Sequence, residues 1–258
     1  VSFDGAVPLS KFVQLNDPVM GGRSSGTWSV DTVGKFGKFD GTVLDVPSLK
    51  APGFIKAAAD GAFADASGAA AGDLVLMVRS STPSYTGFQV SFASGTIAPP
   101  YACAGGGSIP FSRGCFKAPF TVPAGDAFTA VRVPFHAFSD KWSPSTGKQT
   151  TTCADDADVC PTAEKLKAIK RIEVWAEGAD GAVHLDVLSI SAAPPALSTS
   201  VATSCSEAGE AACDADAGCT WCKCAGPLPS QCWTLEDAKQ LPAGVYTCDA
   251  KVEASVRV

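Results

Sequence analysis

Short apolar runs that end in turn residues recur through the first 190 residues of the chain. Residues 86–92 and 128–134 alternate apolar and polar side chains, and this period of two predicts strands. Residues 73–79 are apolar at consecutive positions, which is typical of a buried strand. The same signals predict strands at 42–46, 54–57, 172–177 and 183–190. Many short strands separated by turn clusters predict a mainly β fold, a β-sandwich, with one short helix at 161–170.

The pattern changes near residue 192. Residues 191–200 contain Pro-Pro among Ala and Ser, which is typical of a linker. Beyond it, seven cysteines crowd into residues 205–248, a segment too small for a sufficient apolar core, so disulfides are needed to hold it. We therefore expect a sandwich domain at 1–192, a linker at 193–204 and a cysteine-rich module at 205–258.

Eleven cysteines indicate an oxidising compartment, because thiols in reducing compartments stay unpaired. The first four bracket a Gly-rich loop and an acidic loop, so we expect the pairs Cys103–Cys115 and Cys153–Cys160. Three bridges are expected in the tail, where the spacing leaves the connectivity open and the odd total leaves one thiol over. The candidate disulfide cysteines are Cys103, Cys115, Cys153, Cys160, Cys205, Cys213, Cys219, Cys222, Cys224, Cys232 and Cys248.

Charge and hydropathy argue against two kinds of partner. The net charge is −6 and the pI about 4.9, whereas nucleic-acid binding needs a clustered basic face. The one dense basic stretch, at 165–171, is expected to be an exposed helical face. Apolar runs such as 74–78 are too short to cross a bilayer, so we expect no direct membrane insertion. The start at Val1 is interpreted as a mature form whose targeting peptide has been removed.

Residues 16–24 read Asn-Asp-Pro-Val-Met-Gly-Gly-Arg-Ser. Four blocks follow in order: Phe-Asp-Gly-Thr-Val at 39–43, Pro-Gly-Phe-Ile-Lys at 52–56, Arg-Val-Pro-Phe-His-Ala-Phe at 132–138 and His-Leu-Asp-Val-Leu-Ser-Ile at 184–190. Together they resemble the complex I intermediate-associated protein family, named for an assembly factor of NADH:ubiquinone oxidoreductase. The resemblance implies a galactose-binding-like jelly-roll sandwich and a role in the assembly or stability of respiratory or photosynthetic membrane complexes.

Some features depart from that family. Its members often carry Asp-Gly-x-x-Tyr where this chain has Thr-Pro-Ser-Tyr-Thr-Gly at 82–87. The cysteine-bracketed loops 103–115 and 153–160 are foreign to its organelle-matrix members. In the tail, Cys-x5-Cys-Thr-Trp-Cys at 213–222 loosely resembles the plexin-semaphorin-integrin type of disulfide module.

The first block has two interpretations. In one, Asn16 and Asp17 are polar anchors of a ligand. In the other, which we favour, these side chains cap a turn, Met20 plugs the end of the sandwich, and two glycines let the backbone pass close to a neighbouring strand. A phosphate cradle is disfavoured because no helix or Lys follows. The signature residues are Asn16, Asp17, Met20, Gly21, Gly22 and Ser24.

Catalysis is not expected. The chain has two histidines, His136 and His184, and neither belongs to a motif that sets a base beside a nucleophile. The acidic cluster at 155–158 lies inside a small disulfide loop and is interpreted as a solvated turn rather than a glycosidase pair.

No metal site is predicted, because the zinc-like spacing of Cys219, Cys222 and Cys224 is better explained by disulfides. We expect no cofactor. A structural Ca²⁺ is the one candidate ion, with carboxylates from Asp4, Asp40, Asp45 or Asp186.

Two functional hypotheses follow. The first is a non-catalytic protein-binding module that docks on a membrane complex, in the thylakoid lumen of photosynthetic organisms. Its docking surface is expected on loop residues 104–108 and on the tail aromatics Trp221, Trp233 and Tyr246, since loops on a rigid scaffold commonly carry binding.

The second hypothesis is a secreted carbohydrate-binding module. Sugar binding needs an exposed aromatic platform flanked by polar groups. The candidates are Trp28, Tyr85, Arg79, Trp142 and Trp175, with Trp142, taken as a loop residue, as the best single platform.

Overall fold

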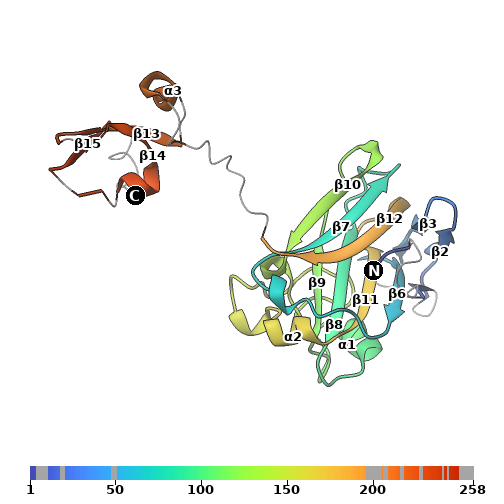
Figure 1. Ribbon diagram of the computed structural model, residues 1–258. Coiled ribbons are helices and arrows are strands. Elements are labelled where there is room, and N and C mark those ends of the chain that lie inside the picture. Colours follow the sequence, from blue (N-terminus) through green and yellow to red (C-terminus); the bar gives the residue numbers. More distant parts are fainter. Residues whose placement is uncertain are drawn as a thin grey trace. The chain divides into compact units, whose positions relative to one another are not determined.

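The computed structural model describes residues 1–3, 11–17, 21–47, 51–195, 205, 209–215, 218–226, 229–239, 241–242 and 244–249. The chain forms two compact units, Val1–Ala196 and Leu197–Val258 (Figure 1). The residue boundaries of the three-part division stay a prediction. None of the described helices is long and apolar enough to cross a membrane.

The first unit is a sandwich of two five-stranded sheets whose neighbouring strands are all antiparallel. One sheet has the strand order β1-β6-β11-β8-β9; its strands are β1 (Val13–Asn16), β6 (Phe54–Asp60), β11 (Ile169–Glu177), β8 (Phe88–Ser94) and β9 (Cys115–Pro119). The other has the order β10-β7-β12-β3-β2; its strands are β10 (Gly125–Pro134), β7 (Asp73–Ser80), β12 (Gly181–Ala193), β3 (Phe36–Val43) and β2 (Ser25–Asp31). The architecture is the mainly β, jelly-roll sandwich that the sequence predicted.

Short elements connect these strands. They are the β4–β5 ribbon (Asp45–Val46 and Ala51–Pro52), the α-helices α1 (Pro99–Gly105) and α2 (Ala163–Lys167), and the 3₁₀ helices η2 (Ser67–Ala69), η3 (Phe135–Ala137) and η4 (Ala157–Val159).

Alternation along the strands fills the space between the sheets. In β8, Phe88, Val90 and Phe92 belong to the main apolar core, because every second side chain of a strand points to the same face. The core-facing residues of β11 lie opposite them, with Val174 beside Val90 in register. Val187 of β12 closes the same core from the second sheet.

The predicted strands are confirmed except at 42–46, a range that the structure divides between the end of β3 and the β4 strand. Of the strands in the two large sheets, β1, β2 and β9 were missed. In β2 most side chains are exposed or half-buried, so its apolar signal is weak. The helix is shorter than the predicted 161–170: Thr162 caps it by accepting from Lys165 N at 3.3 Å, and β11 begins at Ile169. The expectation of one exposed basic helical face is wrong for Arg171, which lies in β11 and is buried.

The second unit is a small three-stranded sheet of order β14-β13-β15. Its described elements are α3 (Glu210–Ala215), β13 (Cys219–Cys224), β14 (Gln231–Thr234), α4 (Leu235–Ala238) and β15 (Tyr246–Cys248). Its bridges are Cys205–Cys219, Cys213–Cys232 and Cys222–Cys248. Four of these cysteines form its buried cluster, with Trp221 packed against them, so sulfur takes the place of an apolar core. Cys224 is free, which corrects its inclusion among the disulfide cysteines.

Candidate functional site: a covered polar sheet face

One sheet turns its second face away from the apolar core, and this face is polar. Alternation and register place Lys56 of β6 beside Trp175 of β11, and Glu173 of β11 between Ala58 of β6 and Ser91 of β8. We call the set the polar face. Its members are Lys56, Asp60, Gln89, Ser91, Lys117, Arg171, Glu173, Trp175 and Glu177.

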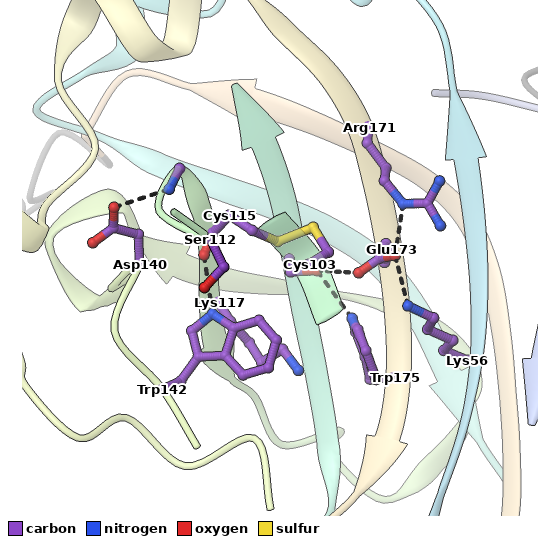
Figure 2. The surroundings of a disulfide bond; sticks show 12 residues. Lys56, Cys103, Ser112, Cys115, Lys117, Asp140, Trp142, Arg171, Glu173 and Trp175 are labelled. Atoms are coloured by element: carbon purple, nitrogen blue, oxygen red, sulfur yellow. Dashed lines mark hydrogen bonds and ion pairs between the residues drawn. A yellow bond between two sulfur atoms is a disulfide. The ribbon is translucent and has the colours of Figure 1, made fainter. Parts of the chain in front are cut away.

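A disulfide-fastened layer lies over the polar face, which accounts for its burial. We call residues 99–114 and 139–149 the cover. Cys103 is bonded to Cys115, as the spacing predicted. Ala93 of β8 packs with this disulfide and with Trp142 in a small second cluster, and Figure 2 shows Trp142 and Trp175 near it.

Trp142 fixes the cover in place. Its indole Nε1 donates to the carbonyl of Cys115 at 3.0 Å, its backbone N donates to Gly106 O at 2.8 Å, and its carbonyl accepts from Ser108 Oγ at 2.7 Å. Gly106 has φ +53°, and a Cβ there would lie 2.3 Å from the Trp142 ring. Only glycine fits this close approach without strain.

Glu173 is the centre of a buried charge network. Its carboxylate accepts from Lys56 Nζ at 3.0 Å, from Arg171 Nε at 2.7 Å and from Ser91 Oγ at 3.0 Å. Arg171 also reaches Asp60 at 2.6 Å. Because every buried charge has an opposite partner, the network avoids the large cost of an isolated ion.

Lys117 and Glu177 form a second buried pair, 2.5 Å apart. The Lys117 ammonium lies 3.6 Å from the ring centroid of Trp142 and 3.5 Å from that of Trp175. This is cation–π geometry at a fully buried lysine, and such attraction is stronger where the charge is desolvated. The two tryptophans therefore bind the protein's own lysine.

Burial and charge set the pKa values on this face. Burial lowers the pKa of Lys117 and raises that of Glu177, and in both the attraction between the partners opposes the shift. Burial also acts to raise the pKa of Glu173, but Lys56 and Arg171 outweigh it, so this pKa lies below its ordinary value. Two glutamates on one strand thus shift in opposite directions, because Glu173 has two cationic partners close by.

The sugar-platform interpretation of Trp142 is wrong: the side chain is 1% exposed and packs inside its own domain. Trp175 is buried as well. Tyr85 is 7% exposed and donates its hydroxyl to Ala179 O at 2.9 Å, so it is no platform either. Arg79 belongs to the other sheet, where its guanidinium pairs with Asp186 at 2.8 Å.

Trp28 of β2 stacks on Phe12, with ring centroids 4.6 Å apart. Of the five candidates, the structure brings only Trp142 and Trp175 together. An indole ring is buried wherever a neighbouring loop covers it, and the sequence alone does not show which loop will do so.

Among the signature residues, Asp17 makes the hydrogen bonds that hold neighbouring segments together. This carboxylate is buried and accepts from Ser24 N at 2.9 Å, Ser24 Oγ at 2.6 Å and Phe54 N at 3.1 Å. A Cβ on Gly53 would lie 1.6 Å from Asp17 Oδ2, and one on Gly22 2.1 Å from Asp17 Cγ. Asp17 thus connects three chain segments, a geometry that fits the structural interpretation rather than a ligand anchor.

Other signature residues have simpler settings. Asn16 donates Nδ2 to Gly26 O at 3.3 Å. Gly21 has φ +77°, the left-handed region that favours glycine. Met20, the expected plug, lies outside the described residues, as does the calcium candidate Asp4.

The two histidines are set apart from the polar face. His184 of β12 contacts Asp40 through Nδ1, and its Nε2 lies 3.6 Å from Asp186. Exposed His136 lies in η3, at the end of β10 where the sequence placed it. Within the described ranges neither ring contacts a Ser hydroxyl or a Cys thiol.

The cysteine groups offer no free ligand set for zinc. Cys219 and Cys222 are in disulfides, and the sulfurs of Cys103 and Cys115 near Glu173 are bonded to each other. Asp45 is exposed on the β4 strand, while Asp40 and Asp186 flank His184. A structural Ca²⁺ stays a prediction.

Sequence reasoning missed Lys56, Lys117 and Arg171 as members of the polar face. One signal was readable: in β11, Glu173, Trp175 and Glu177 alternate and so share a face. When charged residues and tryptophan share one buried face of a strand, the neighbouring strands must supply the opposite charges. Which strands are neighbours is decided by sheet topology.

The fold is an antiparallel β-sandwich with a buried, paired charge network on one sheet face. Residues 1–154 match the family described as complex I intermediate-associated protein 30 (CIA30). The chain belongs to this family. No curated protein matches the sequence.

Solved structures with a similar fold include carbohydrate-binding modules. A family 11 module from Clostridium thermocellum, in complex with a β-1,3-1,4-mixed-linked tetrasaccharide, is 12% identical over 74% of this chain and 94% of that one, with a TM-score of 0.43. The family 11 module of cellulase Lic26A-Cel5E from the same organism is 13% identical over 72% of this chain and 89% of that one, with a TM-score of 0.40. An exo-β-agarase is 16% identical over 75% of this chain and 25% of that one, with a TM-score of 0.38. Likenesses at this level carry no ligand or activity over to this chain.

Proposed function

We propose that this protein is a non-catalytic module that binds protein subunits of a membrane complex, as an extrinsic subunit or assembly factor in an oxidising compartment. The family description supports a role in assembly. Five disulfides support the compartment. In a photosynthetic organism, a photosystem as partner and the thylakoid lumen as compartment would satisfy both the assembly role and the oxidising environment. A secreted location would satisfy only the oxidising environment.

The observation that carries the proposal is Phe111. This side chain is 83% exposed, and the residue has φ +62°, a conformation uncommon for a non-glycine residue. Tyr101 and Ile109 of the same loop are 46% and 41% exposed. Exposed aromatic and aliphatic side chains held on one loop are the kind of group that dominates protein interfaces.

The cover also keeps the cost of ordering low. The Cys103–Cys115 bond closes the loop, and Tyr101 donates its hydroxyl to Pro110 O at 2.9 Å. A surface fixed before binding loses less entropy on association. Of the expected docking residues 104–108, Gly105 and Gly106 are buried against Ser112 and Trp142, whereas residues 104 and 108 are exposed, so docking on this stretch stays a prediction.

The tail aromatics stay a second prediction. Trp233 and Tyr246 are half-buried, with ring centroids 6.2 Å apart, and Trp221 is half-buried against the cystines. Part of each ring is thus used within the second unit itself.

Phe111→Ser tests the protein-binding function, with Val33→Ser as the matched control. Val33 is 92% exposed in the turn between β2 and β3, so both changes remove an exposed apolar side chain from a turn. Purification from detergent-solubilised membranes of the source organism should recover the same complex with wild type and Val33→Ser, and much less with Phe111→Ser.

Equal recovery of the complex with both variants would contradict the proposal. Specific binding on a glycan array that Phe111→Ser leaves intact would favour the carbohydrate hypothesis instead. Trp142→Ala is unsuited to either test, because removing a fully buried indole costs about 3–5 kcal/mol of stability.

A further inference from the structure

β10 lies at the end of its sheet, and its outer edge faces no other described strand (Figure 1). Phe135 N donates to Gly72 O at 2.9 Å, which continues the ladder between β10 and β7. Alternate residues of an antiparallel strand bond to the same neighbour. Val131 therefore bonds to β7, whereas the backbone N–H and C=O groups of Ala130 and Arg132 point to the open edge. Within the described residues no hydrogen bond reaches these backbone groups.

The opposite end of the same sheet is closed. On β2, Trp28 N donates to Gln14 Oε1 at 3.0 Å, and Gly26 O accepts from Asn16 Nδ2 at 3.3 Å. Native sheets usually protect their edges, because unpaired backbone groups attract foreign strands. The open edge of β10 is therefore the exception in its sheet.

The facing sheet extends past its own last strand, β9. Lys117 of β9 and Ser139 exchange two backbone hydrogen bonds, of 2.9 and 3.2 Å. The segment at Ser139 thus continues that sheet beyond β9, while the described residues supply no matching strand beside β10. One sheet therefore reaches further than the other on this side of the sandwich.

A groove of about 330 Å³ lies between β10 and the end of β9. Pro119 and Thr121 line it where β9 ends, Val131 lines it from β10, and Ala137 lines it from the segment that leads to Ser139. Each of these lining residues is exposed or half-buried, so a ligand can reach them.

The groove and the edge together define the chemistry of what fits. Free N–H and C=O groups two residues apart match the backbone of an extended strand, and a groove beside them accepts every second side chain of that strand. Among the described residues that line the groove, only Arg132 is charged, and its Nε lies 2.7 Å from Asp73 Oδ2. Because this pair is neutral, the groove favours uncharged, aliphatic side chains.

The length of the open edge is limited at both ends. The pairing of β10 with β7 is irregular between Gly125 and Thr129, which bounds the regular edge on one side. Pro134, which has no N–H to offer, bounds it on the other. Only a short strand can therefore be added, along residues 129–133.

We propose that β10 binds an extended segment of a partner protein as an additional short strand, with aliphatic side chains at alternate positions in the groove. This inference rests on the proposed protein-binding function and adds a second contact, separate from Phe111. A second copy of this chain is a poorer occupant. The facing sheet reaches past β10 at Ser139, so two sandwiches joined at β10 would collide there, whereas a single strand fits beneath this segment.

Selection from a library of random peptides displayed on phage, with the full, oxidised chain as bait, tests the proposal. The selected peptides should alternate aliphatic and polar residues. When such a peptide binds, the amides of Ala130 and Arg132 should gain protection from hydrogen exchange. The amide of Val131, already bonded to β7, should change little.

Ala130→Pro removes one outward N–H and should weaken binding of the selected peptide at least about fivefold, the effect of one lost hydrogen bond. Ala130→Ser is the matched control, because it keeps the N–H, and it should bind the peptide as wild type does. The Ala130 side chain is exposed, so neither change removes buried packing. Urea unfolding checks that both variants are folded.

Phe111→Ser should leave peptide binding unchanged, so failure at the β10 edge is distinguishable from failure of the membrane-complex proposal. The β10 proposal is overturned if no peptide is selected, or if Ala130→Pro binds the peptide as tightly as wild type. Unchanged exchange at Ala130 and Arg132 overturns it as well, and that measurement needs no variant. It is also overturned, in favour of a second copy, if the free protein dimerises in analytical ultracentrifugation and Ala130→Pro abolishes the dimer.

Discussion

Along β6, β11, β8 and β9 the two faces of the sheet β1-β6-β11-β8-β9 are both largely buried, but by different means. On the inner face, Val90, Phe92 and Val174 pack into the apolar core. On the polar face, Lys56, Lys117 and Glu173 are each 4% exposed or less. The inner face gains free energy from every apolar contact. The polar face gains little net energy, because desolvation of the ions offsets most of their attraction.

This difference predicts how each face tolerates change. On the inner face, the loss of stability grows gradually with the size of the apolar group that is removed. On the polar face, replacing one partner of a buried ion pair causes a large loss of stability, because the other charge stays buried without a partner. Replacing both partners by apolar side chains costs little. The polar face is thus built as a set of matched partners beneath a cover, and three experiments test that description.

The largest effect is expected for Glu177→Leu. It leaves the Lys117 ammonium buried without its carboxylate, and we expect a loss of about 3–5 kcal/mol in the free energy of unfolding, measured by urea denaturation. The double variant Lys117→Met/Glu177→Leu should recover most of this loss. Val174→Ala, on the inner face, is the control. A double variant as unstable as Glu177→Leu alone would show that the face does not depend on matched pairs.

The next effect concerns the cover. Replacing Cys103 and Cys115 by Ser should cost about 2–4 kcal/mol, since the bond restricts the unfolded chain. It should also loosen the layer over Trp142, so tryptophan fluorescence should shift to the red before global unfolding. The equivalent change at Cys153 and Cys160 lacks an adjacent tryptophan in the buried cluster and should lower stability without that shift. Identical fluorescence in the two variants would argue against a cover.

The smallest expected effect is a difference in pH dependence between variants of the two glutamates of β11, Glu173 and Glu177. The pKa of Glu173 is lowered, so its stabilisation is complete above the unfolded pKa, near ~4.3, and is lost as pH falls through the folded pKa. The destabilisation caused by Glu173→Gln should therefore grow as pH rises through this window.

Glu177 has a raised pKa, so the folded state retains its proton more strongly, and ionisation costs stability as pH rises above about 4.3. The destabilisation caused by Glu177→Gln should therefore shrink with rising pH. A difference of one in pKa is worth about 1.4 kcal/mol. Urea unfolding between about pH 3 and about pH 7 measures how the destabilisation caused by each variant changes with pH. The same pH dependence for both variants would contradict the opposed pKa shifts of Glu173 and Glu177.

Much of the fold was readable from the sequence. The alternation at 86–92 and 128–134 and the apolar run at 73–79 correspond to β8, β10 and β7, because local side-chain periodicity directly reflects which face is buried. Strands β1 and β2 were missed, since most of their side chains are exposed or half-buried and their pairing comes from neighbours far along the chain.

The candidate site was less readable. Trp142 was correctly placed in a loop but wrongly expected to be exposed. Its burial depends on Gly106 and on the carbonyl of Cys115, contacts that only the folded loop creates. Lys117 gave no signal of its own, since a lysine in a strand is ordinarily solvated.

The sequence by itself determined most strands of the sandwich, the family and the two disulfide loops, because periodicity, ordered motifs and cysteine spacing are local properties of the chain. Only the tertiary structure decided which charges are paired and which aromatics are exposed. Sheet register sets Lys56 against Glu173, and the disulfide cover buries Trp142 while leaving Phe111 in solvent. These outcomes depend on segments distant along the chain meeting in space, and burial of a charge or a ring is a property of that meeting.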